Sequence, residues 1–211
     1  MGAVAVAVPP DAARLLAGGG LALLPTDTVY GIACAAADVA ACERLYALKQ
    51  RPATQATAAV LGSVPALLEL LPEMGAHAAD ACRALLPGPY TLVVPNPAGR
   101  LAHLCGDAPE RIGLRVPLLD PAVDRLADGA GGLLMTSANL RGGPDPSRLD
   151  QVPQQLRAAA SFEVDGGSLA LECGCGQAPA LVGELAAAGF GEAGVDPDLA
   201  GIERVVWARW R

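Results

Sequence analysis

The chain contains few aromatic residues: Phe, Trp and Tyr together make up 3% of its 211 residues. Apolar residues nevertheless account for 52% of the chain, and this content excludes an intrinsically disordered protein. They are mostly Ala, Leu and Val, so the core must be built from small aliphatic groups. A chain of this length can bury a substantial core, and we predict a single domain over residues 1–211.

Positive charge is scarce relative to negative charge. The chain has 15 Lys and Arg against 22 Asp and Glu, which gives a formal net charge of −7. Nonspecific binding to a phosphate backbone requires a basic face, so this balance argues against direct RNA binding. A local basic cleft for a small anionic ligand remains compatible with it.

A signal for export or membrane insertion is also lacking. The apolar residues 1–8 have no positively charged segment before them, and the run breaks at Pro9-Pro10. This run is far too short to span a bilayer. We therefore expect a cytoplasmic protein that does not associate with membranes.

The cysteine and histidine residues do not complete a metal-binding pattern. Cys173-Gly174-Cys175 has no second Cys or His pair to form a four-ligand zinc set, and His77 and His103 lie far away in sequence. We predict that the six cysteines are reduced thiols, that residues 173–175 form a Gly-rich loop, and that no protein metal site exists.

Helical and strand patterns alternate along the chain, which favours an α/β or α+β fold with helices on a twisted, mixed β-sheet. The Gly- and Ala-rich stretch 172–194 fits neither pattern, and predicts a mobile flap or a divergent C-terminal segment over 172–211. The predicted helices are 11–17 (capped by Asp11), 38–49, one that begins at Ser63, 77–86, part of 121–126, and 148–159 with an interruption at Pro153; the predicted strands are 21–25, 57–61, 90–94, 111–116, 132–136, 162–165 and 203–210.

The densest group of polar side chains is Pro25-Thr26-Asp27-Thr28-Val29-Tyr30-Gly31, directly after the apolar residues 21–24. An apolar run that ends at Pro and leads into short polar side chains is typical of a buried strand that delivers a polar loop. A simple β-turn has the same composition. Both interpretations remain open from this segment alone.

A pair of cations follows the predicted helix 38–49. Pro52 biases Arg51 toward extended geometry, so Lys49 and Arg51, two residues apart, are expected to point to the same side. Such a pair is a plausible clamp for a polyphosphate or a carboxylate. The alternative is a solvated basic pair at a helix C-terminus.

Polar groups also follow or interrupt two apolar strands. Ser137 and Asn139 come after the run 133–135, where an open sheet commonly binds ligands; the alternative is a turn into residues 141–144. Arg115 stands in an otherwise apolar strand and must reach a partner, a cleft or, at an edge strand, solvent.

A further motif, Leu86-Pro87-Gly88-Pro89-Tyr90-Thr91-Leu92, lies between the cation pair and Arg115. Taken together and in this order, these motifs resemble the YrdC-like family of threonylcarbamoyl-AMP synthases. The resemblance covers about residues 10–183. The resemblance implies a sheet with a concave ligand cleft. It also implies an enzyme that forms L-threonylcarbamoyladenylate from L-threonine, bicarbonate or carbon dioxide, and ATP, and releases pyrophosphate. The product serves the threonylcarbamoyladenosine modification of tRNA.

The same resemblance implies roles for individual residues. Catalytic roles fall on Lys49 and Arg51, and Mg²⁺ is expected with the ATP phosphates. Partner proteins of tRNA modification are also expected. The resemblance further assigns substrate or nucleotide binding to Thr28, Tyr30, Arg115, Ser137 and Asn139.

The chain departs from the family pattern in three places. Ala56-Thr57 replaces a Pro-Leu pair, and Pro179-Ala180-Leu181 stands where the family shows Pro-Ser-Thr. A closing Arg-Pro-Gly is not recognisable in residues 205–208. Because a hydroxyl that helps hold the nucleotide is missing at Ala180, we expect weaker nucleotide binding.

Two other functions remain open. The change at Ala180 favours a catalytically weak YrdC-like protein that binds nucleotide or RNA and regulates. The second function is that of a carbamoyl-adenylate-forming module, like the one in hydrogenase maturation proteins. That module normally lies in a much longer chain.

Overall fold

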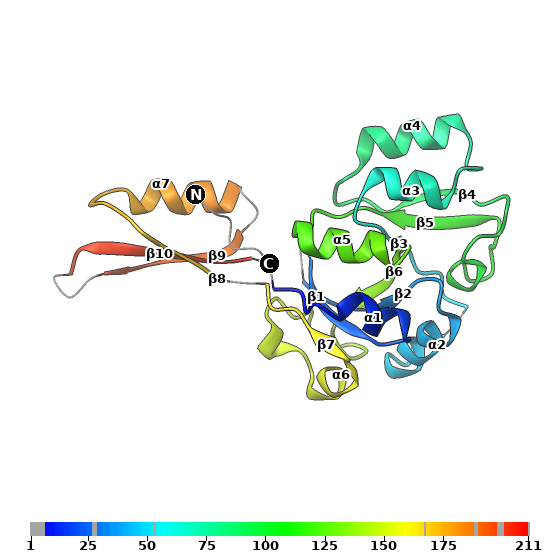
Figure 1. The fold of residues 1–211 in the computed structure, drawn as a ribbon, viewed down its shortest axis with the longest axis horizontal. Helices are drawn as coiled ribbons and strands as arrows, with labels where there is room; N and C mark the ends of the chain where they lie inside the picture. The colour runs from blue at the N-terminus through cyan, green and yellow to red at the C-terminus, as the bar shows by residue number, and fades with distance from the viewer. Residues whose placement is uncertain are drawn as a thin grey trace.

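The computed structural model describes residues 7–26, 29–52, 54–166, 168–187, 190–197 and 201–210. It contains a seven-stranded sheet of order β4-β5-β3-β6-β2-β1-β7 and a separate three-stranded sheet of order β8-β10-β9 (Figure 1). The large sheet comprises β1 (Ala22–Pro25), β2 (Tyr30–Ala35), β3 (Ala59–Val60), β4 (Leu92–Pro95), β5 (Arg111–Arg115), β6 (Leu133–Ser137) and β7 (Phe162–Glu163). The accompanying helices are α1 (Ala12–Ala17), α2 (Val39–Leu48), α3 (Val64–Leu70), α4 (Ala76–Leu85), α5 (Pro121–Gly129) and α6 (Gln154–Ala159), with 3₁₀ turns at Ala102–Leu104 and Leu149–Gln151.

The large sheet is mixed. Its β1–β2, β2–β6, β3–β6 and β4–β5 pairs are antiparallel, whereas β1–β7 and β3–β5 are parallel. Helices and strands alternate along the chain, as the sequence pattern predicted. The predicted fold class, a mixed sheet flanked by helices, is therefore confirmed.

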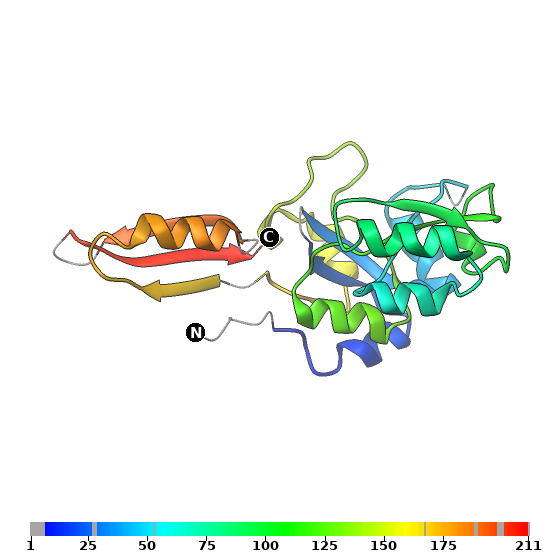
Figure 2. The ribbon, with the colours of Figure 1, turned by 90° about the horizontal axis from the view of Figure 1, so that it is seen from above.

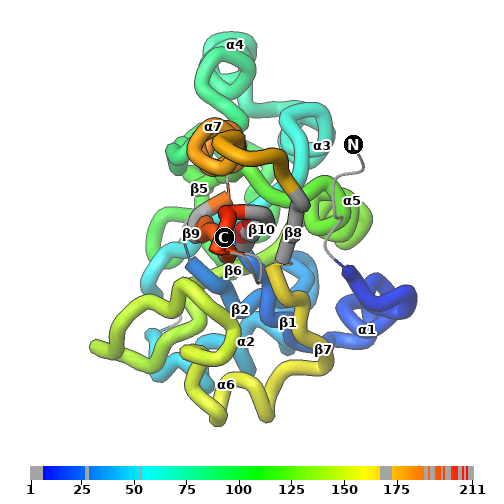
Figure 3. Tube along the Cα trace, turned by 90° about the vertical axis from the view of Figure 1, so that its left-hand side faces the viewer, coloured from blue at the N-terminus to red at the C-terminus, as the bar shows by residue number. Residues whose placement is uncertain are grey.

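Alternate residues of the central strands face two different cores. Leu134 contributes to the core beneath α2, α3 and α4, whereas Leu133 contributes to the core beneath α1 and α5. Successive side chains of a strand point to opposite faces, so a run of apolar residues is required where both faces are covered. Seen from the end that carries the small sheet, α1 and α5 lie on the same side of the large sheet (Figure 3).

Short polar side chains fix the beginnings of three helices. Asp38 accepts from the backbone N–H of Ala41 at the start of α2, and Ser63 does the same for α3. Asp120 begins α5 in this way, with Pro121 at the first helical position. The predicted cap at Asp11 is wrong, because its carboxylate accepts from the Arg14 guanidinium and makes no capping hydrogen bond.

Three further expectations need correction. Residues 30–35, which follow the polar loop, form β2 at the centre of the sheet, although no strand was predicted there. The helix predicted over 148–159 is instead a 3₁₀ turn, Leu149–Gln151, and the helix α6, which are separated at Pro153, the predicted interruption. No helix or strand was predicted within 172–194, whereas its described residues form α7 (Ala178–Ala187) and the start of β9 (Phe190–Pro197); a mobile flap or a divergent C-terminal segment stays a prediction.

The small sheet consists of β8 (Ser168–Glu172), β9 and β10 (Glu203–Trp210). It has its own core beneath α7, which includes Ala178, Leu185 and Val206. Figures 1 and 2 show this unit beside the large sheet rather than stacked on it. Its assignment to one domain with the rest of the chain stays a prediction. Within the described residues, no helix is long and apolar enough to cross a membrane.

Candidate functional site

Lys49 joins the end of α2 to the end of β6. Its ammonium donates to the carbonyl oxygen of Ser137 at 2.6 Å and to Asn139 Oδ1 at 2.7 Å, and it also donates to the carbonyl oxygen of Asn139. The side chain is buried, with the residue only 8% exposed. A lysine has three N–H donors, so these acceptors engage all of them and fix the position of the charge.

Asn139 is held from both ends of its amide. Its Oδ1 also accepts from Ser137 Oγ at 2.9 Å, while its Nδ2 donates to the Gly143 carbonyl at 2.8 Å and to Asp145 Oδ1 at 2.9 Å. These partners determine which end of the amide faces the lysine. We call Lys49, Ser137, Asn139 and Asp145 the amide network.

The charges around the amide network act in opposite directions on the lysine. Burial lowers the pKa of Lys49, the Asp145 carboxylate raises it, and the Arg51 guanidinium lowers it. Asp145 therefore offsets part of the cost of a buried ammonium. Asp145 was not predicted to belong to the site, because an Asp in a Gly- and Pro-rich loop is typical of an ordinary turn.

Arg51 lies next to the amide network but is directed elsewhere. Its guanidinium donates to the Ala56 carbonyl at 2.5 Å, and its Cζ lies 6.0 Å from the centre of the Tyr46 ring. The chain between the two cations is not extended, because Gln50 adopts φ 50°. The predicted same-side arrangement of Lys49 and Arg51 on an extended chain is therefore wrong, although the two cations remain close enough to interact electrostatically.

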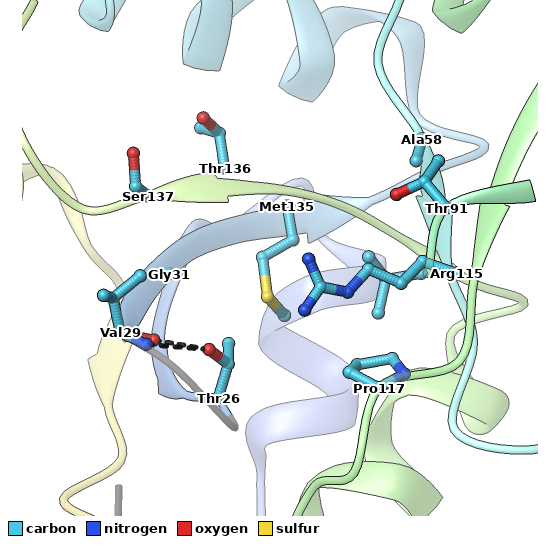
Figure 4. A pocket seen from close by; sticks show the side chains of 11 residues that line it. Thr26, Val29, Gly31, Ala58, Thr91, Arg115, Pro117, Met135, Thr136 and Ser137 are labelled. Carbon is cyan, nitrogen blue, oxygen red and sulfur yellow. Dashed lines mark hydrogen bonds between the residues drawn. The ribbon is translucent and has the colours of Figure 1, made fainter. Parts of the chain in front are cut away.

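A cavity of about 270 Å³ lies beside β6, and we call it the β6 cavity (Figure 4). Figure 4 shows the Arg115 guanidinium directed toward the Met135 side chain, whereas the hydroxyls of Thr136 and Ser137 point away from them. Of the predicted site residues, Arg115 and Ser137 line the β6 cavity. The cavity is lined by Thr26, Val29, Gly31, Ala58, Val60, Thr91, Arg115, Pro117, Met135, Thr136 and Ser137.

The polar loop before β2 shapes one side of the β6 cavity. Thr26 Oγ1 donates to the Val29 carbonyl at 2.6 Å and accepts from the Val29 N–H, which connects the end of β1 to the residue before β2. A Cβ at Gly31 would lie 2.8 Å from Cγ and Sδ of Met135, so the absence of a side chain there leaves room for Met135.

Other predicted residues lie elsewhere. Tyr30 is buried, and its hydroxyl donates to Asp165 Oδ1 at 3.1 Å and accepts from the Gly166 N–H at 2.7 Å, so it fastens the chain that leaves β7. Thr28 lies outside the described residues. Ala180 is an exposed residue of α7 and does not line the β6 cavity. Weaker nucleotide binding through the missing hydroxyl at Ala180 stays a prediction.

Comparison with known proteins identifies the same portion of the chain. The "Putative threonylcarbamoyl-AMP synthase" of Mycobacterium leprae is 35% identical over 74% of this chain and 70% of its own length. The threonylcarbamoyl-AMP synthase of Stutzerimonas stutzeri is 34% identical over 73% of this chain and 84% of its own length.

Solved structures show the same fold. Sua5 of P. abyssi in complex with L-threonine is 28% identical and superimposes with a TM-score of 0.65 over 74% of this chain. The chain spans only 46% of that longer protein. E. coli YciO superimposes with a TM-score of 0.62 at 22% identity, which supports the fold. The model of the Sua5/YciO/YrdC family, described as "Telomere recombination", matches residues 14–174, and the chain therefore belongs to this family.

Proposed function

We propose that this chain is a threonylcarbamoyl-AMP synthase, a nucleotidyltransferase that acts in tRNA modification. The observation that carries the proposal is that relatives with this name are 34–35% identical over more than 70% of the chain. The family match over residues 14–174 contains the whole amide network and the whole β6 cavity. The amide network and the β6 cavity thus both lie in the portion of the chain that matches the family.

The proposed reaction has two steps. The amine of L-threonine adds to carbon dioxide and loses a proton, which gives a carbamate. A carbamate oxygen then attacks the α-phosphorus of ATP, and the bond to the β-phosphate oxygen breaks as pyrophosphate leaves. The protein's contribution is to hold these groups in line and to offset the charge that shifts onto the phosphate oxygens.

The positions of the cations suit this role. The Lys49 ammonium is fixed by its three acceptors and brings a positive charge to the end of β6 without further reorganisation. The Arg51 guanidinium lies beside it, and Arg115 lines the adjoining β6 cavity. We infer that Lys49 and Arg51 stabilise the transferring phosphate and that Arg115, Ser137 and Asn139 orient the substrate.

The β6 cavity suits the amino-acid part of the reaction. Its volume of about 270 Å³ lies just below the range of roughly 300–1,000 Å³ typical of small-molecule sites. Hydroxyl-bearing residues, Thr26 and Thr91, lie among apolar ones, Val29 and Met135, which matches a ligand with a hydroxyl and a methyl group. We propose that threonine carbamate binds here and that ATP, with Mg²⁺ on its phosphates, extends beyond the cavity.

The setting of the reaction follows from the product. A mixed anhydride of a carbamate and AMP is reactive and must be passed to an enzyme that transfers the threonylcarbamoyl group to adenosine in tRNA. We propose that partner proteins in the cytoplasm perform this transfer. With a net charge of −7, the chain itself is not expected to hold the tRNA.

Omission of single substrates tests the proposal. The purified chain is incubated with ATP, Mg²⁺, L-threonine and bicarbonate, and pyrophosphate is measured. We expect release that requires all four components and falls strongly when L-valine, which lacks the hydroxyl, replaces L-threonine. Release without threonine, or none under any condition, would reject the proposal and leave a nucleotide-binding regulator as the better interpretation.

A further inference from the structure

Two cysteines meet at the interface between the large sheet and α2, away from the β6 cavity. Cys34 projects from β2 and Cys42 from α2, and their sulfur atoms are 3.8 Å apart. Both residues are almost completely buried. A disulfide bond requires a separation of about 2.05 Å, so a small shift of either side chain would bring the sulfurs into bonding distance.

A histidine lies beside one of the two thiols. His103 Nε2 lies 2.8 Å from the Ala36 carbonyl oxygen, to which the Cys42 thiol is also directed at 3.8 Å. Hydrogen bonds from Cys34 and His103 to Cys42, together with the charge of His103, lower the pKa of Cys42 to about 7, against the effects of burial and of Asp38. The pKa of Cys34 is raised by its hydrogen bond to Cys42 and by burial. The directions of these shifts favour the thiolate form at Cys42 over that at Cys34.

Cys42 is also the member of the pair that borders a pocket. A pocket of about 240 Å³ is lined by Cys42, His103 and Tyr46, with the carboxylates of Glu43 and Asp107 on its wall. The carboxylates disfavour anionic reagents, whereas a small neutral oxidant can enter. Across the described portion of the chain, no three His, Cys, Asp or Glu side chains are arranged to hold a metal ion.

We propose that Cys34 and Cys42 form a peroxide-sensitive dithiol, with Cys42 as the attacking sulfur and Cys34 as the resolving sulfur. The Cys42 thiolate attacks one oxygen of hydrogen peroxide and breaks the O–O bond, which gives a sulfenic acid and, after protonation, water. The Cys34 sulfur then attacks the Cys42 sulfur, its proton leaves with the hydroxyl as a second water, and the disulfide forms. Hydrogen peroxide is reduced by two electrons, which the two thiols supply.

Peptide mapping of the whole chain tests this proposal. The reduced chain is treated with one equivalent of hydrogen peroxide at pH 7, its remaining thiols are blocked with N-ethylmaleimide, and it is digested with trypsin. Because no Lys or Arg lies between Arg14 and Arg44, both cysteines remain on the peptide 15–44. We expect this peptide to be about 2 Da lighter than its reduced form and to carry no maleimide, since disulfide formation removes two hydrogens.

Two other cysteines are internal controls. Cys82 and Cys105 are buried, and burial raises the pKa of each thiol, so both are expected to remain reduced and become blocked after unfolding. Oxidation of Cys82 or Cys105 at the same rate as the pair would contradict a selective site. So would recovery of the peptide 15–44 with maleimide on both of its cysteines.

Single variants distinguish the roles of the two sulfurs. In Cys34→Ser, the sulfenic acid at Cys42 has no resolving thiol, and we expect dimedone to label Cys42. In Cys42→Ser, we expect no label at Cys34. His103→Gln retains a donor for Ala36 and should slow oxidation of the otherwise wild-type chain at pH 7 about fivefold, because a smaller fraction of Cys42 is then thiolate. Labelling of Cys34 in place of Cys42, or an unchanged rate in His103→Gln, would overturn these assignments.

Discussion

The Lys49 ammonium lies 2.7 Å from Asn139 Oδ1, and it directs its remaining protons to the backbone carbonyls of Ser137 and Asn139. Lys49 thus supports the end of β6 as well as supplying charge. In Lys49→Met, these buried acceptors lose their donor, and an unpaired buried polar group costs about 1–3 kcal/mol. We expect chemical denaturation to show a loss of about 3 kcal/mol in the free energy of unfolding, together with loss of activity.

Arg51→Met is the matched control for Lys49→Met. The guanidinium is partly exposed and donates to the Gln55 and Ala56 carbonyls. Removal of such a cation typically costs about 0–1 kcal/mol. We expect pyrophosphate release to fall at least a hundredfold in this variant, with little change in stability. Equal losses of stability in the two variants would contradict the structural role assigned to Lys49.

Gly31→Ala tests whether the β6 cavity binds substrate. The added methyl group would lie 2.8 Å from Cγ and Sδ of Met135, a residue that lines the β6 cavity, so the Met135 side chain must shift. We expect the KM for L-threonine to rise about tenfold, which corresponds to about 1.4 kcal/mol of binding. Shortening the displaced side chain, in Gly31→Ala with Met135→Ala, should recover most of this loss. Gly129→Ala is the control, because open space surrounds Gly129; an unchanged KM in Gly31→Ala would place the threonine elsewhere.

Tyr30→Phe tests the placement of the tyrosine of the polar loop. The substitution removes the acceptor of the buried Gly166 N–H and the donor to Asp165. We expect the free energy of unfolding to fall by about 1–3 kcal/mol, measured by denaturant titration. Tyr90→Phe, at an exposed position, is the control and should change little. Unaltered stability in Tyr30→Phe would mean that the hydroxyl does not fasten residues 165–166.

Asp124 gives the fold a specific pH dependence. Burial, with the nearby charges of Asp128 and Asp120, raises the pKa of Asp124 from 3.8 to about 7, and its Oδ1 makes no hydrogen bond. Between these pH values the folded state binds more protons than the unfolded state, so this group lowers stability as the pH rises and leaves it reduced above pH 7. We expect Asp124→Asn to stabilise the chain by on the order of 1–3 kcal/mol at pH 8, after allowance for its partial exposure, and by far less at pH 4.

Thermal unfolding at the two pH values measures this effect. Asp80→Asn is the control, because the Asp80 side chain is 76% exposed and pairs only with Arg83 at the surface. A gain from Asp124→Asn that is the same at both pH values would show that the carboxylate does not titrate in this range.

The local signals of the sequence explain why most elements were predicted. Ser63 and Asp38 cap helices with their own side chains, and apolar runs such as 133–135 require burial whatever the partner. Such features depend on neighbours in the chain. By contrast, β2 begins within a polar loop and is defined by hydrogen bonds to β1 and β6, which lie before it and far after it in sequence.

The residues of the candidate site were predictable, but the hydrogen bonds that connect them were not. Lys49, Ser137 and Asn139 were predicted as site residues from the family resemblance, since spacing alone left a solvated basic pair and a turn open, and the structure brings them into one network. Their connection to Asp145 depends on the path of the loop after β6, which has no periodic signal. The predicted role of Ala180 at the nucleotide rests on a short tripeptide match in a segment that forms the helix α7, and it stays a prediction.

Incorporation of labelled bicarbonate tests the central claim most directly. The chain is incubated with ATP, Mg²⁺, L-threonine and ¹³C-bicarbonate, and the adenylate is identified by mass spectrometry beside the pyrophosphate released. We expect one labelled carbon in a threonylcarbamoyl adenylate, one pyrophosphate for each adenylate formed, and loss of both in Arg51→Met. An adenylate without the label, or an equal yield from Arg51→Met, would contradict the assignment of this reaction to the site at the end of β6.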